Sequence, residues 1–140
     1  MNILVATDGS IYTKRMLAYL AAHDEWLGAN HQYTVITVVM ALPARATALV
    51  DKADVKRYYE DEAEKVFKPI RAFLARKGIS ASYVAKVGHA ADHIGRLAET
   101  GAFHLLMMGS HGHGELKSLV MGSVVTKVLA QCKTPLLLIR

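Results

Sequence analysis

Residues 107–124 have the types and spacing best suited to binding an anion. An apolar run, His104–Met108, ends at a glycine-rich stretch, and Gly122-Ser123 then leads into a helix-like sequence at 124–129. The glycines of the stretch are Gly109, Gly112 and Gly114. Because the first N–H groups of a helix lack internal partners and lie at its positive end, this order of strand, loop and helix predicts a phosphate site built from backbone amides. We expect Gly122 to let a phosphate approach the main chain and Ser123 to cap the helix.

The spacing of these glycines excludes two common phosphate loops. A Walker A loop requires a lysine that does not follow a suitably spaced glycine here, and Gly112-His113-Gly114 lacks the third glycine of the dinucleotide fingerprint. The pattern present, from Gly109 to Ser123, is G-x2-G-x9-G-[ST]. It is the phosphate-binding pattern of the universal stress protein family, which the chain resembles along its whole length, from Ile3–Ser10 to Pro135–Ile139. The alternative is a surface loop whose glycines only form turns.

The resemblance implies an adenine-nucleotide site at the ends of the strands and the start of the last helix. Asp8 would accept hydrogen bonds from the ribose hydroxyls, the backbone near Val38 and Met108 would contact the adenine, and the glycine loop would hold the phosphates. The residues carried over from the family are Ala6, Thr7, Asp8, Val38, Met108, Gly109, Ser110, His111, Gly112, Gly122, Ser123 and Val124. Ala6 departs from the proline common in nucleotide-binding members. Asp8 has an alternative role as a capping carboxylate, but capping by Ser10 would favour the ribose role.

Hydrophobic periodicity predicts five strands alternating with four helices. We place the strands at 1–7, 33–40, 80–87, 104–108 and 136–139, the helices at 13–27, 51–77, 90–99 and 124–129, and a loop at 41–50. This alternation favours one α/β domain over 1–140, with a parallel sheet and right-handed crossovers. The resemblance implies a five-stranded parallel sheet in the order 3-2-1-4-5, flanked by four helices, as in adenine nucleotide alpha hydrolase-like folds. Pro69 removes one hydrogen bond from its helix, so we expect a kink or two helical pieces there.

Composition narrows the class of protein further. The apolar runs in these 140 residues are far shorter than the roughly 20 residues that span a bilayer, and no basic segment opens the chain. We therefore expect a cytoplasmic protein with neither a signal peptide nor a membrane partner. The net charge of +5 is scattered, which favours a solvated surface over a nucleic-acid partner. Cys132 is the single cysteine and cannot form an internal disulfide.

Catalytic and metal-binding alternatives have weaker support in the sequence. His111 and His113 are close together, but no CxxC or HExxH spacing supports a metal held by the protein. Lys117 either neutralises phosphate charge or is solvated, and Glu115 is the only carboxylate close to the loop in sequence. Phosphoryl transfer usually requires Mg²⁺ with a placed carboxylate and a group that orients the nucleophile. We therefore expect a binding site, with at most slow ATP hydrolysis and no catalytic residue assigned.

These observations predict an ATP-binding universal stress protein that acts as a regulator or sensor in the stress response. Any Mg²⁺ or Mn²⁺ that accompanies ATP would be held mainly by the phosphates. Two alternatives are a slow ATPase or nucleotidyl-transferring enzyme that uses the same crevice, and a ligand-free dimeric interaction module. The last strand, Leu136–Ile139, is nearly all apolar and would be an unprotected edge, and the resemblance implies a homodimer through it.

Overall fold

A computed structural model describes residues 1–114 and 120–140 of the chain. Its centre is a sheet of parallel strands with the spatial order β3-β2-β1-β4-β5. The strands are β1 (Asn2–Thr7), β2 (Gln32–Val39), β3 (Ala81–Val87), β4 (Leu105–Gly109) and β5 (Leu136–Ile139). The predicted α/β class and the strand order 3-2-1-4-5 are therefore confirmed.

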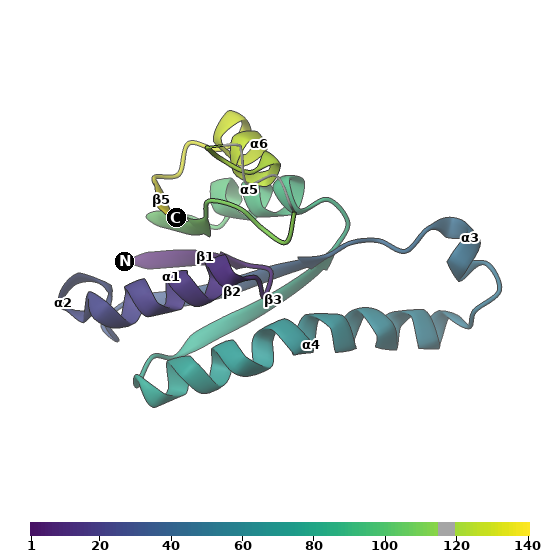
Figure 1. Ribbon diagram of the computed structural model, residues 1–140, viewed down its shortest axis with the longest axis horizontal. Coiled ribbons are helices and arrows are strands. Elements are labelled where there is room, and N and C mark those ends of the chain that lie inside the picture. The colour runs from purple at the N-terminus through teal and green to yellow at the C-terminus, as the bar shows by residue number, and fades with distance from the viewer. Residues whose placement is uncertain (115–119) are drawn as a thin grey trace.

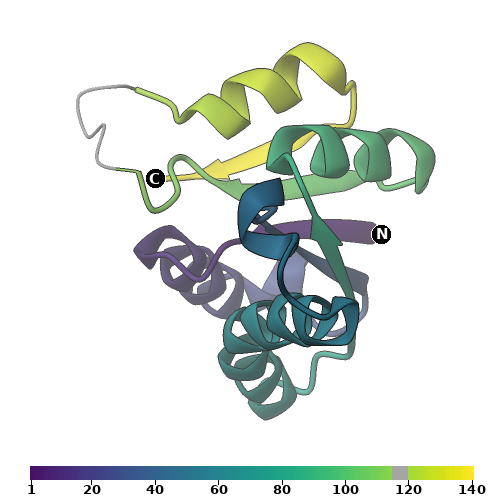
Figure 2. The same ribbon diagram turned by 90° about the vertical axis from the view of Figure 1, so that its right-hand side faces the viewer.

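Helices cover both faces of this sheet (Figures 1 and 2). α1 (Ile11–Ala22) and α4 (Lys52–Arg76) lie on one face, and α5 (Ala90–Thr100) and α6 (Ser123–Gln131) lie on the other. These are the four predicted helices. Two short helices were not predicted: α2 (Asp24–Leu27), and α3 (Ala44–Thr47) inside the segment predicted to be a loop.

The predicted helix at 13–27 is interrupted at His23. The backbone of His23 has φ −127° and ψ 46°, outside the helical region, and its ring nitrogen Nδ1 lies 2.8 Å from the carbonyl oxygen of Tyr19. α2 then starts with Asp24 and Glu25, whose negative charges suit a helix N-terminus. The apolar spacing continues across the interruption, which is why the sequence pattern did not reveal it.

Alternate residues of β1 pack into the two separate layers of the core. Ile3 and Val5 contact the cluster beneath α1 and α4, whereas Leu4 and Ala6 contact the cluster beneath α5 and α6. Side chains of a strand alternate between the faces of a sheet, so a strand covered on both faces must be apolar at nearly every position. The uninterrupted apolar run of β1 thus follows from its place in the middle of the sheet.

The prediction that Pro69 divides its helix into two pieces is wrong. α4 is one helix of 25 residues with Pro69 inside it. Pro69 and Lys65, whose carbonyl loses its helical partner, are both exposed, so that carbonyl can face water. Phe67 and Ile70 on either side of the proline are buried in the core and fix both halves of the helix to the sheet.

Replacing Pro69 by alanine should therefore stabilise the protein. Pro69→Ala restores one backbone hydrogen bond at an exposed position, and we expect the free energy of unfolding to rise by about 1–3 kcal/mol. Urea denaturation followed by circular dichroism measures this change. The exposed neighbour substitution Lys68→Ala is the control and should alter stability by less than about 0.5 kcal/mol. A loss of stability in Pro69→Ala would show that α4 needs the proline.

Candidate functional site

A cavity of about 350 Å³ opens at the carboxyl ends of β1 and β4. These two strands are neighbours, and the chain leaves β1 for α1 on one face and β4 for α6 on the other. Such a divergence opens a crevice beyond the strand ends, where open parallel sheets bind ligands. The residues lining the cavity are Ala6, Thr7, Asp8, Tyr12, Thr13, Val38, Ala90, Ile94, Met108, Gly109, His111, Gly112, His113, Gly114, Gly122, Ser123, Val124 and Val125.

All the residues predicted to contact a nucleotide line this cavity except Ser110. Ser110 is buried with an exposed fraction of 2%, and its backbone links separate elements. Its N–H donates to the carbonyl of Ile139 at 2.7 Å, and its carbonyl accepts from the N–H of Gly122 at 2.7 Å. Ser110 therefore joins β5 to the start of α6 and is not among the residues lining the cavity, while its predicted nucleotide contact stays a prediction.

The Asp8 carboxylate is shared between a turn and the cavity. Its Oδ1 accepts hydrogen bonds from the N–H of Ser10 at 2.9 Å and from the hydroxyl of Thr13 at 3.2 Å. Its Oδ2 points toward Gly112, because a Cβ atom added to Gly112 would lie 2.6 Å from this oxygen. Ser10 is the N-cap residue of α1, as expected, but its side chain forms no capping hydrogen bond. Asp8 contributes to the turn itself and still presents one oxygen at Gly112.

The start of α6 supplies backbone donors to the cavity. Gly122 is the N-cap residue and Ser123 is the first residue of the helix, so the prediction of Ser123 as the cap is displaced by one position. The first hydrogen bond of the helix is donated by the N–H of Thr126 to the carbonyl of Gly122, at 3.1 Å. The N–H groups of residues 123–125 therefore have no partner within the helix, and all of these residues line the cavity. Unpartnered N–H groups at the start of a helix suit an anion, and the phosphate site predicted here stays a prediction.

The absence of a side chain at Gly122 has a packing cause that the sequence did not predict, and its predicted role in admitting a phosphate stays a prediction. A Cβ atom there would lie 3.2 Å from the carbonyl oxygen of Ser110 and 3.3 Å from the Cα of His111. Both neighbours belong to the backbone, so the glycine lets α6 approach the segment after β4. Gly109 is required for a similar reason, because its Cβ would lie 2.5 Å from the Cβ of Tyr12 on α1. Two of the pattern glycines thus hold the cavity walls close together.

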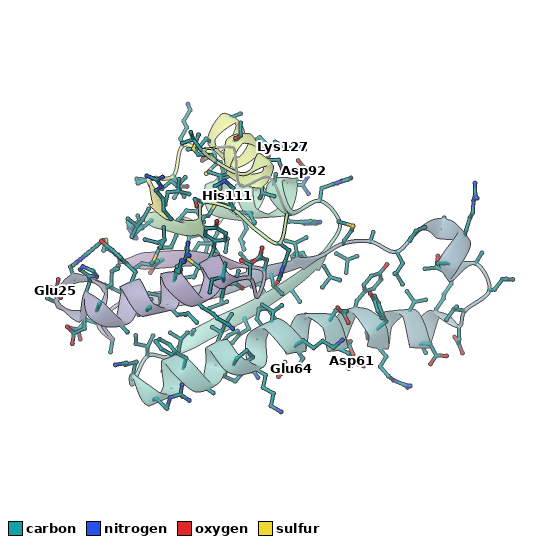
Figure 3. The ribbon with its side chains drawn as sticks, viewed as in Figure 1. Glu25, Asp61, Glu64, Asp92, His111 and Lys127 are labelled. Carbon is teal, nitrogen blue, oxygen red and sulfur yellow. The ribbon has the colours of Figure 1, made fainter. Side chains whose placement is uncertain are left out.

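The residues that the sequence did not predict come mainly from the first turns of helices. Ala90 and Ile94 are four residues apart on α5, so their spacing could have placed both on one face, but no motif marks them. Tyr12 lies 5.3 Å from His111 between ring centroids, and His111 lies above α1 in the view of Figure 3. The Nε2 of His113 lies 2.7 Å from the carbonyl oxygen of Asp8 and connects the glycine segment to β1.

Asp8 is the only carboxylate, and no lysine or arginine is present, among the described residues that line the cavity. The predicted roles of Glu115, Lys117 and Ser118 lie outside the described residues. Within residues 1–114 and 120–140, no group of three or more histidine, cysteine or acidic side chains is arranged to hold a metal ion. In the same part of the chain, no helix is long and apolar enough to span a bilayer. Among the described residues, the donors that the lining offers to an anion are therefore the N–H groups at the start of α6 and uncharged or histidine side chains.

Two curated relatives are similar in sequence to this chain. Universal stress protein Slr1230 of Synechocystis is 29% identical over 139 residues, which are 99% of this chain and 42% of the relative. Universal stress protein MJ0577 of Methanocaldococcus jannaschii is 28% identical over 87 residues, which are 62% of this chain and 54% of the relative. The chain spans about half the length of these two curated relatives.

Solved structures share the fold over nearly the whole chain. A structure of MJ0577 has a TM-score of 0.80 at 24% identity and covers 99% of this chain and 94% of its own. A universal stress protein in complex with cAMP has a TM-score of 0.63 at 24% identity, with 100% and 97% covered. An Arabidopsis thaliana family member with AMP bound has a TM-score of 0.71 at 14% identity, with 99% and 90% covered.

The whole chain also matches a family model. The match extends over residues 1–140, and the model is that of the universal stress protein family. It includes both strands that border the cavity and the glycine segment between them. With this match over its whole length, and with Gly109, Gly112, Gly122 and Ser123 of the pattern lining one cavity, the chain belongs to the universal stress protein family.

Proposed function

We propose that the cavity between the ends of β1 and β4 binds an adenine nucleotide. The observation that carries this proposal is the meeting, in one cavity, of apolar walls, a carboxylate and the N-terminus of α6. A nucleotide requires these three environments for its base, its ribose and its phosphate. The relatives solved with AMP and with cAMP contain adenine nucleotides, which supports the same ligand class for this chain.

Each part of the cavity suits one part of the ligand. Val38, Met108 and Ile94 provide the apolar surface on which an adenine ring would lie. The Oδ2 atom of Asp8 would accept hydrogen bonds from the ribose hydroxyls. The N–H groups at residues 123–125 would bind the phosphate, because they have no partner within the helix and lie at its positive end.

We further propose that ATP is the physiological nucleotide, with any Mg²⁺ or Mn²⁺ held mainly by its phosphates, and that the protein acts as a stress-linked regulator in the cytoplasm. The segment after β4 contacts β1 through His113 and contacts α6 through Ser110. A bound nucleotide would stabilise these contacts together and could bias the surface that partners bind. This role requires binding and release without chemical conversion.

The first test removes the charge of the proposed ribose acceptor. Asp8→Asn keeps an oxygen for the N–H of Ser10 and the hydroxyl of Thr13 but replaces the second oxygen by an amide. We expect the affinity for AMP to fall about tenfold, as for the loss of a charged hydrogen bond worth about 1.5 kcal/mol. Isothermal titration calorimetry measures this affinity. Asp61→Asn on the exposed face of α4 is the matched control and should bind as the unmodified protein does.

The second test moves the same carboxylate without changing it. Gly112→Ala places a Cβ atom 2.6 Å from Oδ2 of Asp8, so the carboxylate must shift and nucleotide affinity should fall by about tenfold or more. Because both substitutions act on one group, the double variant should lose little more affinity than either single variant. Fully additive losses in a calorimetric double-mutant cycle would contradict this coupling between Gly112 and Asp8.

We also propose that the protein forms a homodimer through β5. This strand lies at the end of the sheet and pairs only with β4 among the described residues. The carbonyl of Pro135 accepts a hydrogen bond from the N–H of Leu106 in β4 at 2.8 Å, and the carbonyl of Ile139 accepts one from Ser110, directly after β4, at 2.7 Å. Because alternate residues of a strand direct their backbone groups to the same side, Leu136 and Leu138 direct theirs to the open edge. An open edge of this kind can pair with a second copy of the strand.

A proline at the edge of β5 tests this dimer. Leu138→Pro removes an outward N–H group while leaving the ladder to β4 intact, so we expect a shift from dimer to monomer by light scattering. Leu138→Ala is the matched control, because it shortens the side chain but keeps the N–H group, and it should remain dimeric. An unmodified protein that is monomeric at concentrations of about 100 µM would refute the proposed dimer, since tight pairing gives a micromolar or lower dissociation constant.

A further inference from the structure

A second hollow of about 490 Å³ lies beside the nucleotide cavity, along the start of α1. Ser10, Ile11 and Arg15 line this hollow and do not line the nucleotide cavity. Tyr12 and the segment 111–114 line both, so they form a common wall. The proposed nucleotide role of the first cavity gives no function to the residues found only in the second.

The start of α1, which borders this hollow, has N–H groups without helical partners and one unpaired hydroxyl. The first hydrogen bond that returns to the start of α1 runs from Lys14 to the carbonyl of Ser10, which leaves the N–H groups of residues 11–13 without helical partners. The side chain of Ser10, in a residue with an exposed fraction of 5%, is the only buried side-chain polar group among the described residues that has no hydrogen-bond partner. A serine at this position normally accepts a hydrogen bond from its own helix, but this one does not. A buried unpaired hydroxyl is rare enough to require an explanation.

Among the described residues that line the hollow, Arg15 carries a permanent positive charge. Arg15 is exposed, and its guanidinium lies 5.2 Å from the centre of the Tyr12 ring. No ion pair within the described parts of the chain involves Arg15. The described residues lining the hollow include this arginine and two histidines but no carboxylate. An arginine, free helix N–H groups and an unpaired hydroxyl all bind oxyanions.

We propose that this hollow is a second anion subsite, formed by Ser10, Arg15 and the N-terminus of α1, that binds a phosphate-type oxyanion. The oxyanion has two sources with the same chemistry. It is the distal phosphates of a nucleotide whose base lies in the first cavity, reaching past the shared wall at 111–114, or it is a separate phosphate group. Only the first source rests on the proposed nucleotide function.

The test compares Arg15→Gln with Lys14→Gln. Each substitution removes one positive charge from an exposed position of α1, but only Arg15 lines the hollow. Calorimetric affinities for AMP, ATP and inorganic pyrophosphate are measured for both variants and for the unmodified protein at one fixed ionic strength. Fixed salt is essential because exposed charges are strongly screened.

If the distal phosphates of a nucleotide occupy the subsite, Arg15→Gln lowers the affinity for ATP about tenfold and changes the affinity for AMP by less than twofold. If a separate oxyanion occupies the subsite, Arg15→Gln lowers the affinity for pyrophosphate about tenfold and leaves the affinities for both nucleotides unchanged. In both cases Lys14→Gln matches the unmodified protein. Equal behaviour of the two variants toward ATP and pyrophosphate would overturn the subsite. If the unmodified protein binds no nucleotide, the proposed function fails and the pyrophosphate comparison alone decides the subsite.

Ser10→Ala tests the hydroxyl separately. The hydroxyl has no partner in the unliganded protein, so its removal should not lower the free energy of unfolding. Ser10→Ala should also lower the affinity for the ligand whose binding Arg15→Gln weakens, by about threefold to tenfold. If Ser10→Ala has unchanged affinity for this ligand and a higher free energy of unfolding, the hydroxyl is not part of the subsite.

Discussion

The close approach of Gly112 to the Asp8 carboxylate is the contact on which the proposed site depends. Asp8 follows β1 and Gly112 follows β4, and these strands are neighbours in space although about 100 residues separate them in the chain. Only a residue without a Cβ atom allows the carboxylate oxygen to occupy its observed position. His113 adds a second connection to the carbonyl of the same aspartate. The wall of the cavity is thus fixed to the strand that carries its one described carboxylate.

The glycines of the family pattern have separate structural roles in this chain. Gly109 permits contact with α1, Gly112 accommodates Asp8, and Gly122 lets α6 approach the segment after β4. None of these three positions has a positive φ. A side chain would be harmful at each position because there is little room for a Cβ atom, and not because the backbone conformation is unusual. The glycine pattern therefore has two effects. It provides backbone amides without helical partners, and it specifies the packing that brings these amides to the cavity.

Much of the fold could be predicted from the sequence because its strands and long helices have clear hydrophobic patterns. The strand order came from the family resemblance, since periodicity alone does not say which strands are neighbours. The interruption at His23 was missed because the apolar spacing continues through it. The continuity of α4 through Pro69 depends on burial on both sides of the proline, which local helix propensity does not include.

The cavity was predicted less completely than the fold. Positions carried by the glycine pattern could be assigned from spacing, but Tyr12 and Ile94 enter the cavity from helices that have no nucleotide motif. The place of Ser110 within the motif suggested a ligand contact, but spacing could not reveal that its backbone also links β5 to the start of α6. The unpaired hydroxyl of Ser10 could not be foreseen at all, since serine before a helix predicts a cap.

The central claim is that backbone amides beyond the carboxyl ends of the strands bind the phosphate of an adenine nucleotide. Its most direct test is an NMR titration of ¹⁵N-labelled protein with AMP, which follows each backbone amide separately. The account predicts saturable shifts concentrated at the amides of residues 109–114 and 122–125, with smaller shifts near Asp8 and Val38. Absence of saturable shifts, or shifts concentrated at the outer face of α4, would contradict it.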